Sequence, residues 1–163
     1  MKLIAFDQST TATGWCVMEM DNSKIVAYGA IHPIGPTNER IRETVKKCIS
    51  LCKKFEVAFV FVEGIQFQKN AVVFQVLAKL EGTLEICLEE KGYFVNVVKA
   101  AEWRKRVGIK NKKRADVKQE AIDMVNEVYQ IQPSEDECEA ILFARAFSAR
   151  NVEDALKIVL EEE

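Results

Sequence analysis

The sequence predicts an α/β domain with a five-stranded mixed sheet flanked by helices. Three short strand patterns open the chain, at 2–7, about 13–20 and about 24–31. A nearly continuous apolar run, 57–62, follows a stretch of helical periodicity, and such a run is typical of a central strand covered on both faces. The order of strands and helices therefore predicts three antiparallel strands followed by two parallel ones.

Length and composition fit one globular domain over residues 1–163. The chain is 48% hydrophobic, which is enough for a proper core, and its net charge is only -2. No apolar run approaches the ~20 residues of a membrane helix. The first apolar run is broken by Asp7, so we expect no signal peptide.

Five cysteines without a Cys-x-x-Cys pair favour reduced thiols in a cytosolic compartment. The single histidine, His32, excludes a His-rich zinc site. It precedes Pro33 at the end of a predicted strand, and we expect no catalytic role for it.

The elements follow from local patterns. Asp21-Asn22-Ser23 is a natural hairpin turn between the second and third strands. Apolar residues recur with helical period from Thr37 to about Phe55, and the crossover through this helix places strand 57–62 beside the first strand. The remaining predicted elements are a long helix at about 70–91, a strand at 93–98, helical pieces at about 100–106 and 112–129, and helices at about 134–149 and 151–161.

Acidic residues end two of these strands and open one of the helices. Asp7 ends the first strand and Glu63 ends the central one, so parallel neighbours would bring them together at the edge where open α/β sheets carry their chemistry. Asp136 and Glu139 share one face of the helix at 134–149, whose apolar continuation packs toward the sheet. Each has an ordinary structural alternative, Asp7 as a turn residue and the other two as acids near a helix N-terminus.

Four gathered carboxylates repel one another unless cations neutralise them. Oxygen ligands without histidine or cysteine favour Mg²⁺ or Mn²⁺. Two such ions about 4 Å apart can hold the attacking and leaving oxygens of a phosphodiester. The acids therefore predict a metal-dependent site for phosphodiester hydrolysis.

A basic segment, residues 99–118, lies between the two groups of acids. Nine basic and two acidic residues give it a charge of +7, which leaves -9 for the rest of a chain whose total is -2. This density is typical of contact with a phosphate backbone, although a solvated helical surface is the alternative. The basic residues are Lys99, Arg104, Lys105, Arg106, Lys110, Lys112, Lys113, Arg114 and Lys118.

A polar loop after Glu63 carries Phe67 and Lys69. Lys69 is expected to add a contact with DNA. Phe67 can stack on an unpaired base or cap the core, and both interpretations stay open.

Several motifs recur in one order along about residues 2–147. They are the strand-ending Asp7, Val62-Glu63 followed by Phe67-x-Lys69-Asn70-Ala71 before the long helix, Val107-Gly108-Ile109 before a basic helix start, and Asp136-x-x-Glu139-Ala140. In these features the chain resembles the RuvC-type Holliday junction resolvases, which have an RNase H-like fold.

The resemblance implies a crossover junction endodeoxyribonuclease. It implies a homodimer with the 70–91 helix at its interface and two symmetric sites that nick opposed strands of a four-way junction, leaving 5′-phosphate ends. By position, Asp7, Glu63, Asp136 and Glu139 would be the ligands of Mg²⁺, for which Mn²⁺ can substitute. Residues Lys69, Arg104, Lys105 and Arg114 fall where the family has basic residues that contact DNA.

The chain also departs from the family pattern. The usual Gly-Ile-Asp-Pro-Gly start is Ala5-Phe6-Asp7-Gln8-Ser9 here, and Glu139 stands where Asp is usual. Phe67 aligns with the family's loop aromatic only with a one-residue offset. These differences indicate a divergent branch, such as a phage-encoded resolvase, acting in the cytoplasm of a prokaryotic or phage-infected cell.

Three other functions stay open at this point. Residues 7–13 also resemble the phosphate-binding loop of sugar kinases and actin, although those proteins need two such domains. A branched-DNA binding protein that does not cut would gain nothing from the acids. A different RNase H-like nuclease, acting on RNA–DNA hybrids or on non-junction DNA, fits the same residues.

Overall fold

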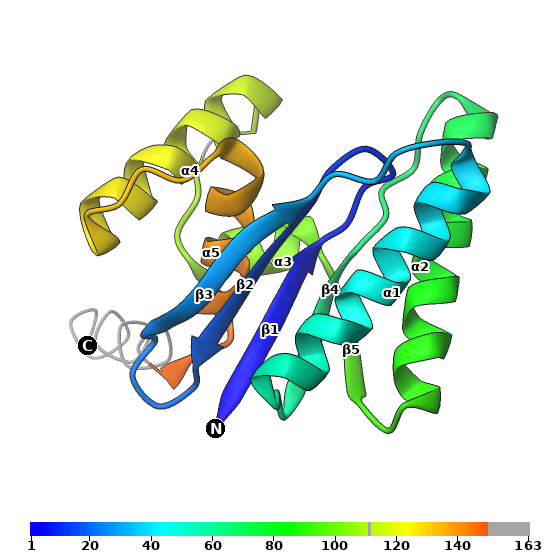
Figure 1. Cartoon of the computed structure of the whole chain (residues 1–163). Helices are drawn as coiled ribbons and strands as arrows, with labels where there is room; N and C mark the ends of the chain where they lie inside the picture. The colour runs from blue at the N-terminus through cyan, green and yellow to red at the C-terminus, as the bar shows by residue number, and fades with distance from the viewer. Residues whose placement is uncertain (111, 150–163) are drawn as a thin grey trace.

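A mixed five-stranded sheet forms the centre of the computed structural model, which describes residues 1–110 and 112–149 (Figure 1). Its strands lie in the order β3-β2-β1-β4-β5. The pairs β1–β2 and β2–β3 are antiparallel, whereas β1–β4 and β4–β5 are parallel, as predicted. The strand bounds are β1 Lys2–Asp7, β2 Thr13–Glu19, β3 Ile25–Ile31, β4 Phe59–Gly64 and β5 Phe94–Lys99.

Helices cover both faces of the sheet (Figure 1). Alternate residues of β1 point to opposite faces, so Ile4 and Phe6 pack with the first two helices while Leu3 and Ala5 pack with the last one. All four of these side chains are fully buried, which explains why the first apolar run is continuous rather than alternating. The helix bounds are α1 Thr37–Phe55, α2 Ala71–Glu90, α3 Ala100–Arg106, α4 Arg114–Tyr129 and α5 Glu135–Ala146.

Element boundaries differ from the sequence prediction by up to three residues, and the largest difference is at α5, which ends at Ala146 rather than at about 149. Strand β4 begins at Phe59 rather than at 57, because Glu56 adopts a left-handed conformation and Val57 still donates its N–H to the Cys52 carbonyl at the end of α1. Helix α4 begins at Arg114 rather than at 112, with Lys113 as its N-cap. The predicted helix at 151–161 lies outside the described residues.

Helix α5 is seated on the sheet by its first turn. Ser134 is its N-cap and forms a capping box with Glu137. Gly14 of β2 lies directly beneath this turn, because a Cβ at that position would come within 2.2 Å of the Asp136 carbonyl oxygen. Only glycine therefore lets the acidic start of α5 approach the sheet this closely.

Within the described part of the chain, no helix combines the length and apolar character needed to cross a membrane. The five cysteines, all of which lie in that part, are free thiols.

Candidate active site

The four acids predicted from the sequence meet at one end of the sheet. Asp7 is the last residue of β1, and the parallel register that pairs Phe6 with Val62 places Glu63 of β4 beside it. Asp136 and Glu139 come from the first turns of α5, which packs across β1 and β2. All four side chains line one cleft. We call these four residues the acidic cluster.

Asp7 lies at the electrostatic centre of the acidic cluster. Burial is the main cause that raises the pKa of its carboxyl well above the usual value. The negative charges of Glu63, Glu139 and Asp136 raise it further, in that order, while Arg104 acts in the opposite direction. Asp7 thus interacts electrostatically with all three of the other acids.

The pKa of Glu63 is also raised, as the balance of effects that act in opposite directions. Burial raises the pKa of its carboxyl, and the charge of Glu139 adds to this effect. A hydrogen bond from Trp103 and the charge of Arg104 lower it. Asp7 and Glu63 are thus two half-buried carboxylates whose ionisation is opposed by desolvation and by the negative charge of their neighbours.

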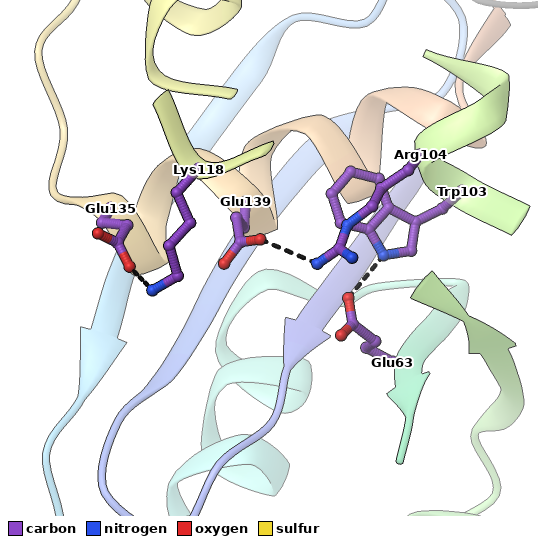
Figure 2. A network of polar contacts seen from close by, with 6 residues as sticks. All are labelled: Glu63, Trp103, Arg104, Lys118, Glu135 and Glu139. Carbon is purple, nitrogen blue, oxygen red and sulfur yellow. Dashed lines mark hydrogen bonds and ion pairs between the residues drawn. The ribbon is translucent and has the colours of Figure 1, made fainter. Parts of the chain in front are cut away.

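Two side chains of α3 contact the acidic cluster (Figure 2). The indole N–H of Trp103 donates to Glu63 Oε2 at 2.6 Å. The Arg104 guanidinium donates through Nη2 to Glu139 Oε1 at 3.1 Å, and Glu139 is only 7% exposed. Arg104, which we expected to contact DNA, is therefore a partly buried ion-pair partner inside the site.

The acidic cluster fits a hard divalent cation by its donor atoms. All four side chains offer carboxylate oxygens, and a cation would relieve the repulsion that raises the pKa of Asp7. Within residues 1–110 and 112–149, no three His, Cys, Asp or Glu side chains already stand in a metal-binding arrangement. Two of the carboxylates are instead engaged by Trp103 and Arg104. The gathering of the acids is confirmed, and their binding of metal stays a prediction.

The basic segment contributes to the same cleft. Arg104, Lys112, Arg114 and Lys118 line it, and Lys118 forms an ion pair with Glu135 (Figure 2). The other basic residues predicted to contact DNA are exposed and lie outside the cleft lining: Lys69, Lys105, Lys110 and Lys113. The lining of the cleft thus combines the acidic cluster with four basic side chains.

Phe67 projects from the loop between β4 and α2. Its side chain is 82% exposed and packs against Phe74, with ring centroids 5.8 Å apart. The interpretation of Phe67 as a cap on the core is therefore wrong, because the ring lies outside the core. Its stacking on a DNA base stays a prediction.

Sequence reasoning missed three residues that shape the site. Gly14 admits α5 to the sheet, Trp103 bonds the Glu63 carboxylate, and Gln8 donates its Nε2 to the Glu63 carbonyl at 2.9 Å. Gln8 stands where the family pattern has proline, and this departure was one available signal. A tryptophan within a charged helical stretch was a second signal, since it implies a buried face.

The loop that resembles a kinase phosphate loop is closed on itself. Thr13 Oγ1 donates to the Ser9 carbonyl at 3.0 Å and accepts from the Ser9 N–H at 3.2 Å. Ser9 and Thr11 share a further hydroxyl contact of 3.1 Å. These hydroxyls hold the turn between β1 and β2 together.

Comparison with solved structures shows the fold. RuvC of T. thermophilus, in complex with a Holliday junction substrate, matches with a TM-score of 0.74 at 17% identity, over 92% of this chain and 95% of that one. The yeast mitochondrial Holliday junction resolvase Ydc2 matches with a TM-score of 0.63 at 13% identity, over 93% and 79%. The Fowlpox virus resolvase, also with junction DNA, matches with a TM-score of 0.60 at 12% identity, over 96% and 99%.

These likenesses show that the chain has the fold of the Holliday junction resolvases, an RNase H-like fold. The family model described as crossover junction endodeoxyribonuclease RuvC matches residues 3–146. The chain therefore belongs to the RuvC family, which confirms the predicted class of enzyme, a structure-specific endonuclease for junction DNA. No curated protein sequence matches the chain.

The raised pKa of Asp7 predicts that Asp7→Asn stabilises the metal-free protein at pH 7. The folded state holds the proton more tightly than the unfolded state, so ionisation of Asp7 destabilises the fold. This penalty is absent below the ordinary pKa near 3.8, grows as the pH rises toward the raised value, and is complete above it. We expect the melting temperature in EDTA at pH 7 to rise by about 2–4 °C, as for about 1 kcal/mol in a chain of this size.

Asp21→Asn is the matched control, because Asp21 is an exposed turn residue. It should leave the melting temperature unchanged. The gain from Asp7→Asn should shrink as the pH is lowered toward 4. An Asp7→Asn protein that melts at or below the unchanged protein at pH 7 would contradict this account of the site.

Proposed function

We propose that Asp7, Glu63, Asp136 and Glu139 bind Mg²⁺, with Mn²⁺ as a substitute, and that this site hydrolyses phosphodiester bonds in four-way DNA junctions. The observation that carries the proposal is that all four carboxylates line one cleft, where the charges of the other three acids raise the pKa of the half-buried Asp7. When bound, the ions supply an activated water and stabilise the leaving 3′-oxygen. Asp7 would hold the ions together with Glu63 and with Asp136 or Glu139.

The basic residues that line the cleft support a role for it in binding DNA. Lys112, Arg114 and Lys118 line the cleft beside the acids, so a phosphate that reaches the acidic cluster would meet cations next to it. Arg104 already pairs with Glu139, so it would offset the charge of the site itself. The other basic residues of the segment would extend the contact along the DNA backbone, together with Lys69 and the exposed ring of Phe67.

A homodimer formed through α2 would provide the paired cuts. One side of this helix is buried through Leu80, Leu84 and Leu88. Elsewhere on α2, Val72 is 68% exposed and Ile86 is 58% exposed, which is apolar surface that a second copy would cover. A two-fold axis at this helix would give two equivalent sites for opposed strands.

The five free cysteines support an intracellular setting in which thiols stay reduced. We place the protein in the cytoplasm of a prokaryotic cell or of a phage-infected host.

The central test is cleavage of labelled DNA by the purified protein. A four-way junction, a three-way fork, a linear duplex and an RNA–DNA hybrid are each incubated with and without Mg²⁺. We expect paired, symmetric nicks in the junction only with metal. Asp7→Asn should abolish cutting and leave junction binding intact or tighter, because it removes a negative charge near phosphate.

Each other outcome refutes part of the proposal. Normal cutting by Asp7→Asn would show that the site is misplaced. Preferred cutting of the RNA–DNA hybrid would indicate a different RNase H-like nuclease. Binding of the junction without cutting, under Mg²⁺ or Mn²⁺, would indicate a junction-binding protein.

Replacing Lys112, Lys113 and Arg114 together with alanine should weaken junction binding and flatten its dependence on salt. Each lost phosphate contact lowers the slope of log affinity against log salt by about 0.9, so three contacts lower it by up to about 2.7. The measurement is a binding titration at several salt concentrations. The charge-matched control replaces Lys24, Lys46 and Lys53, which are exposed and do not line the cleft. Equal slopes for the two triple variants would rule out the basic segment.

Ile86→Glu should convert the dimer to a monomer and uncouple the two nicks. Light scattering should give twice the chain mass of 18.5 kDa for the unchanged protein and the single mass for the variant. Val128→Glu, at a position 46% exposed on α4, should remain dimeric. A monomeric unchanged protein that still makes paired nicks would contradict the proposed interface.

A further inference from the structure

Trp103 is a fully buried aromatic residue whose only polar atom is directed at an acid of the site (Figure 2). Its Nε1–H donates to Glu63 Oε2 at 2.6 Å. We propose that Trp103 is the positioning residue that holds the Glu63 carboxylate for metal binding. The inference rests on the metal role proposed above for Glu63.

The indole of Trp103 is held rigidly. It is 0% exposed and stacks on Phe143 of α5, with ring centroids 5.6 Å apart and an interplanar angle of 27°. It therefore belongs to the core that joins α3 and α5 to the sheet. A donor fixed by such packing defines one position for the oxygen that accepts from it.

Hydrogen bonds therefore hold both the main chain and the side chain of Glu63. Its main-chain carbonyl accepts from Gln8 Nε2 at 2.9 Å, and its Oε2 accepts from Trp103. Among the described residues, Oε1 of Glu63 has no hydrogen-bond partner in the structure, and the residue lines the cleft. The carboxylate thus keeps one oxygen for a cation while the other anchors its orientation.

A neutral donor suits this task better than a charged one. Arg104 pairs with Glu139 through a full positive charge, which a metal ion would have to replace. The indole N–H carries no net charge, so it orients Glu63 and favours its ionised form without cancelling the negative charge that attracts the cation. Trp103 and Arg104 are neighbours on α3, yet they act differently on the two glutamates.

The test is the affinity of the protein for Mn²⁺ in the absence of DNA, measured by the free-ion signal in electron paramagnetic resonance. Trp103→Phe keeps an aromatic ring to stack on Phe143 and removes the donor. We expect Mn²⁺ to bind about 10–100-fold more weakly, the range for loss of a hydrogen bond behind a metal ligand. Trp15→Phe is the matched control, since Trp15 packs on Phe55 and does not line the cleft, and it should bind Mn²⁺ normally.

A double-mutant cycle shows whether Trp103 acts through Glu63. In a Glu63→Gln background, Trp103→Phe should cause little further loss of Mn²⁺ affinity. Saturating metal should also restore most of the junction cleavage by Trp103→Phe. An affinity of Trp103→Phe for Mn²⁺ that equals or exceeds that of the unchanged protein would overturn the proposal, and an equal loss in the Glu63→Gln background would overturn it as well.

A second measurement keeps Trp103 in place and avoids any folding defect. Trp103 is the one tryptophan left in the Trp15→Phe protein, because the chain has two. Paramagnetic Mn²⁺ should quench its fluorescence over the same concentrations at which the ion binds, and excess Mg²⁺ should reverse the quenching. Binding of Mn²⁺ without quenching would overturn the placement of the ion beside Trp103. Absence of any Mn²⁺ binding by the unchanged protein would instead refute the proposed function.

Discussion

The gathering of the half-buried Asp7 with three other carboxylates in one cleft is the constraint on which the rest of this structure depends. Desolvation and like charge both oppose its ionisation, whereas the charge of Arg104 lowers the pKa of both Asp7 and Glu63. An arrangement that we expect to lower the stability of the metal-free protein is hard to explain by folding alone. It is explained if divalent cations complete the site, because they convert the repulsion into binding energy for the metal. The RuvC family match gives that arrangement its chemical context.

Two independent features of the fold bring the acids together. The parallel register of β1 and β4 fixes Asp7 beside Glu63, and slipping it by one residue would turn every buried side chain of β1 to the wrong face. The capping box at Ser134 fixes where α5 starts, and Gly14 lets that start lie against β2. Helix α3 then adds Trp103 and Arg104 above the acids. Backbone geometry places the four carboxylates, and side-chain contacts from α3 hold those of Glu63 and Glu139.

Features that arise from neighbouring residues in the sequence could be predicted, whereas contacts between distant residues could not. The central strands β1 and β4 and the acids at their ends could be predicted, because a strand buried on both faces must be a continuous apolar run. The pairing of Asp136 with Glu139 followed from helical spacing. The partners of Glu63 and Glu139 could not be predicted, since Trp103 and Arg104 reach them across 40 and 35 residues of chain. The exposure of Phe67 could not be predicted either, because it depends on how the loop between β4 and α2 projects beyond the sheet. Strand β4 starts late because a left-handed Glu56 lengthens the connection, which no residue pattern indicated.

Locating a bound metal ion tests the central claim most directly. Crystals of the protein grown with Mn²⁺ would give anomalous scattering at the manganese edge, which reports the position of the ion without reference to activity. The account predicts Mn²⁺ bound by Asp7 together with at least two of Glu63, Asp136 and Glu139. Saturating Mn²⁺ that leaves Asp7 without a metal, or that binds elsewhere on the chain, would contradict it.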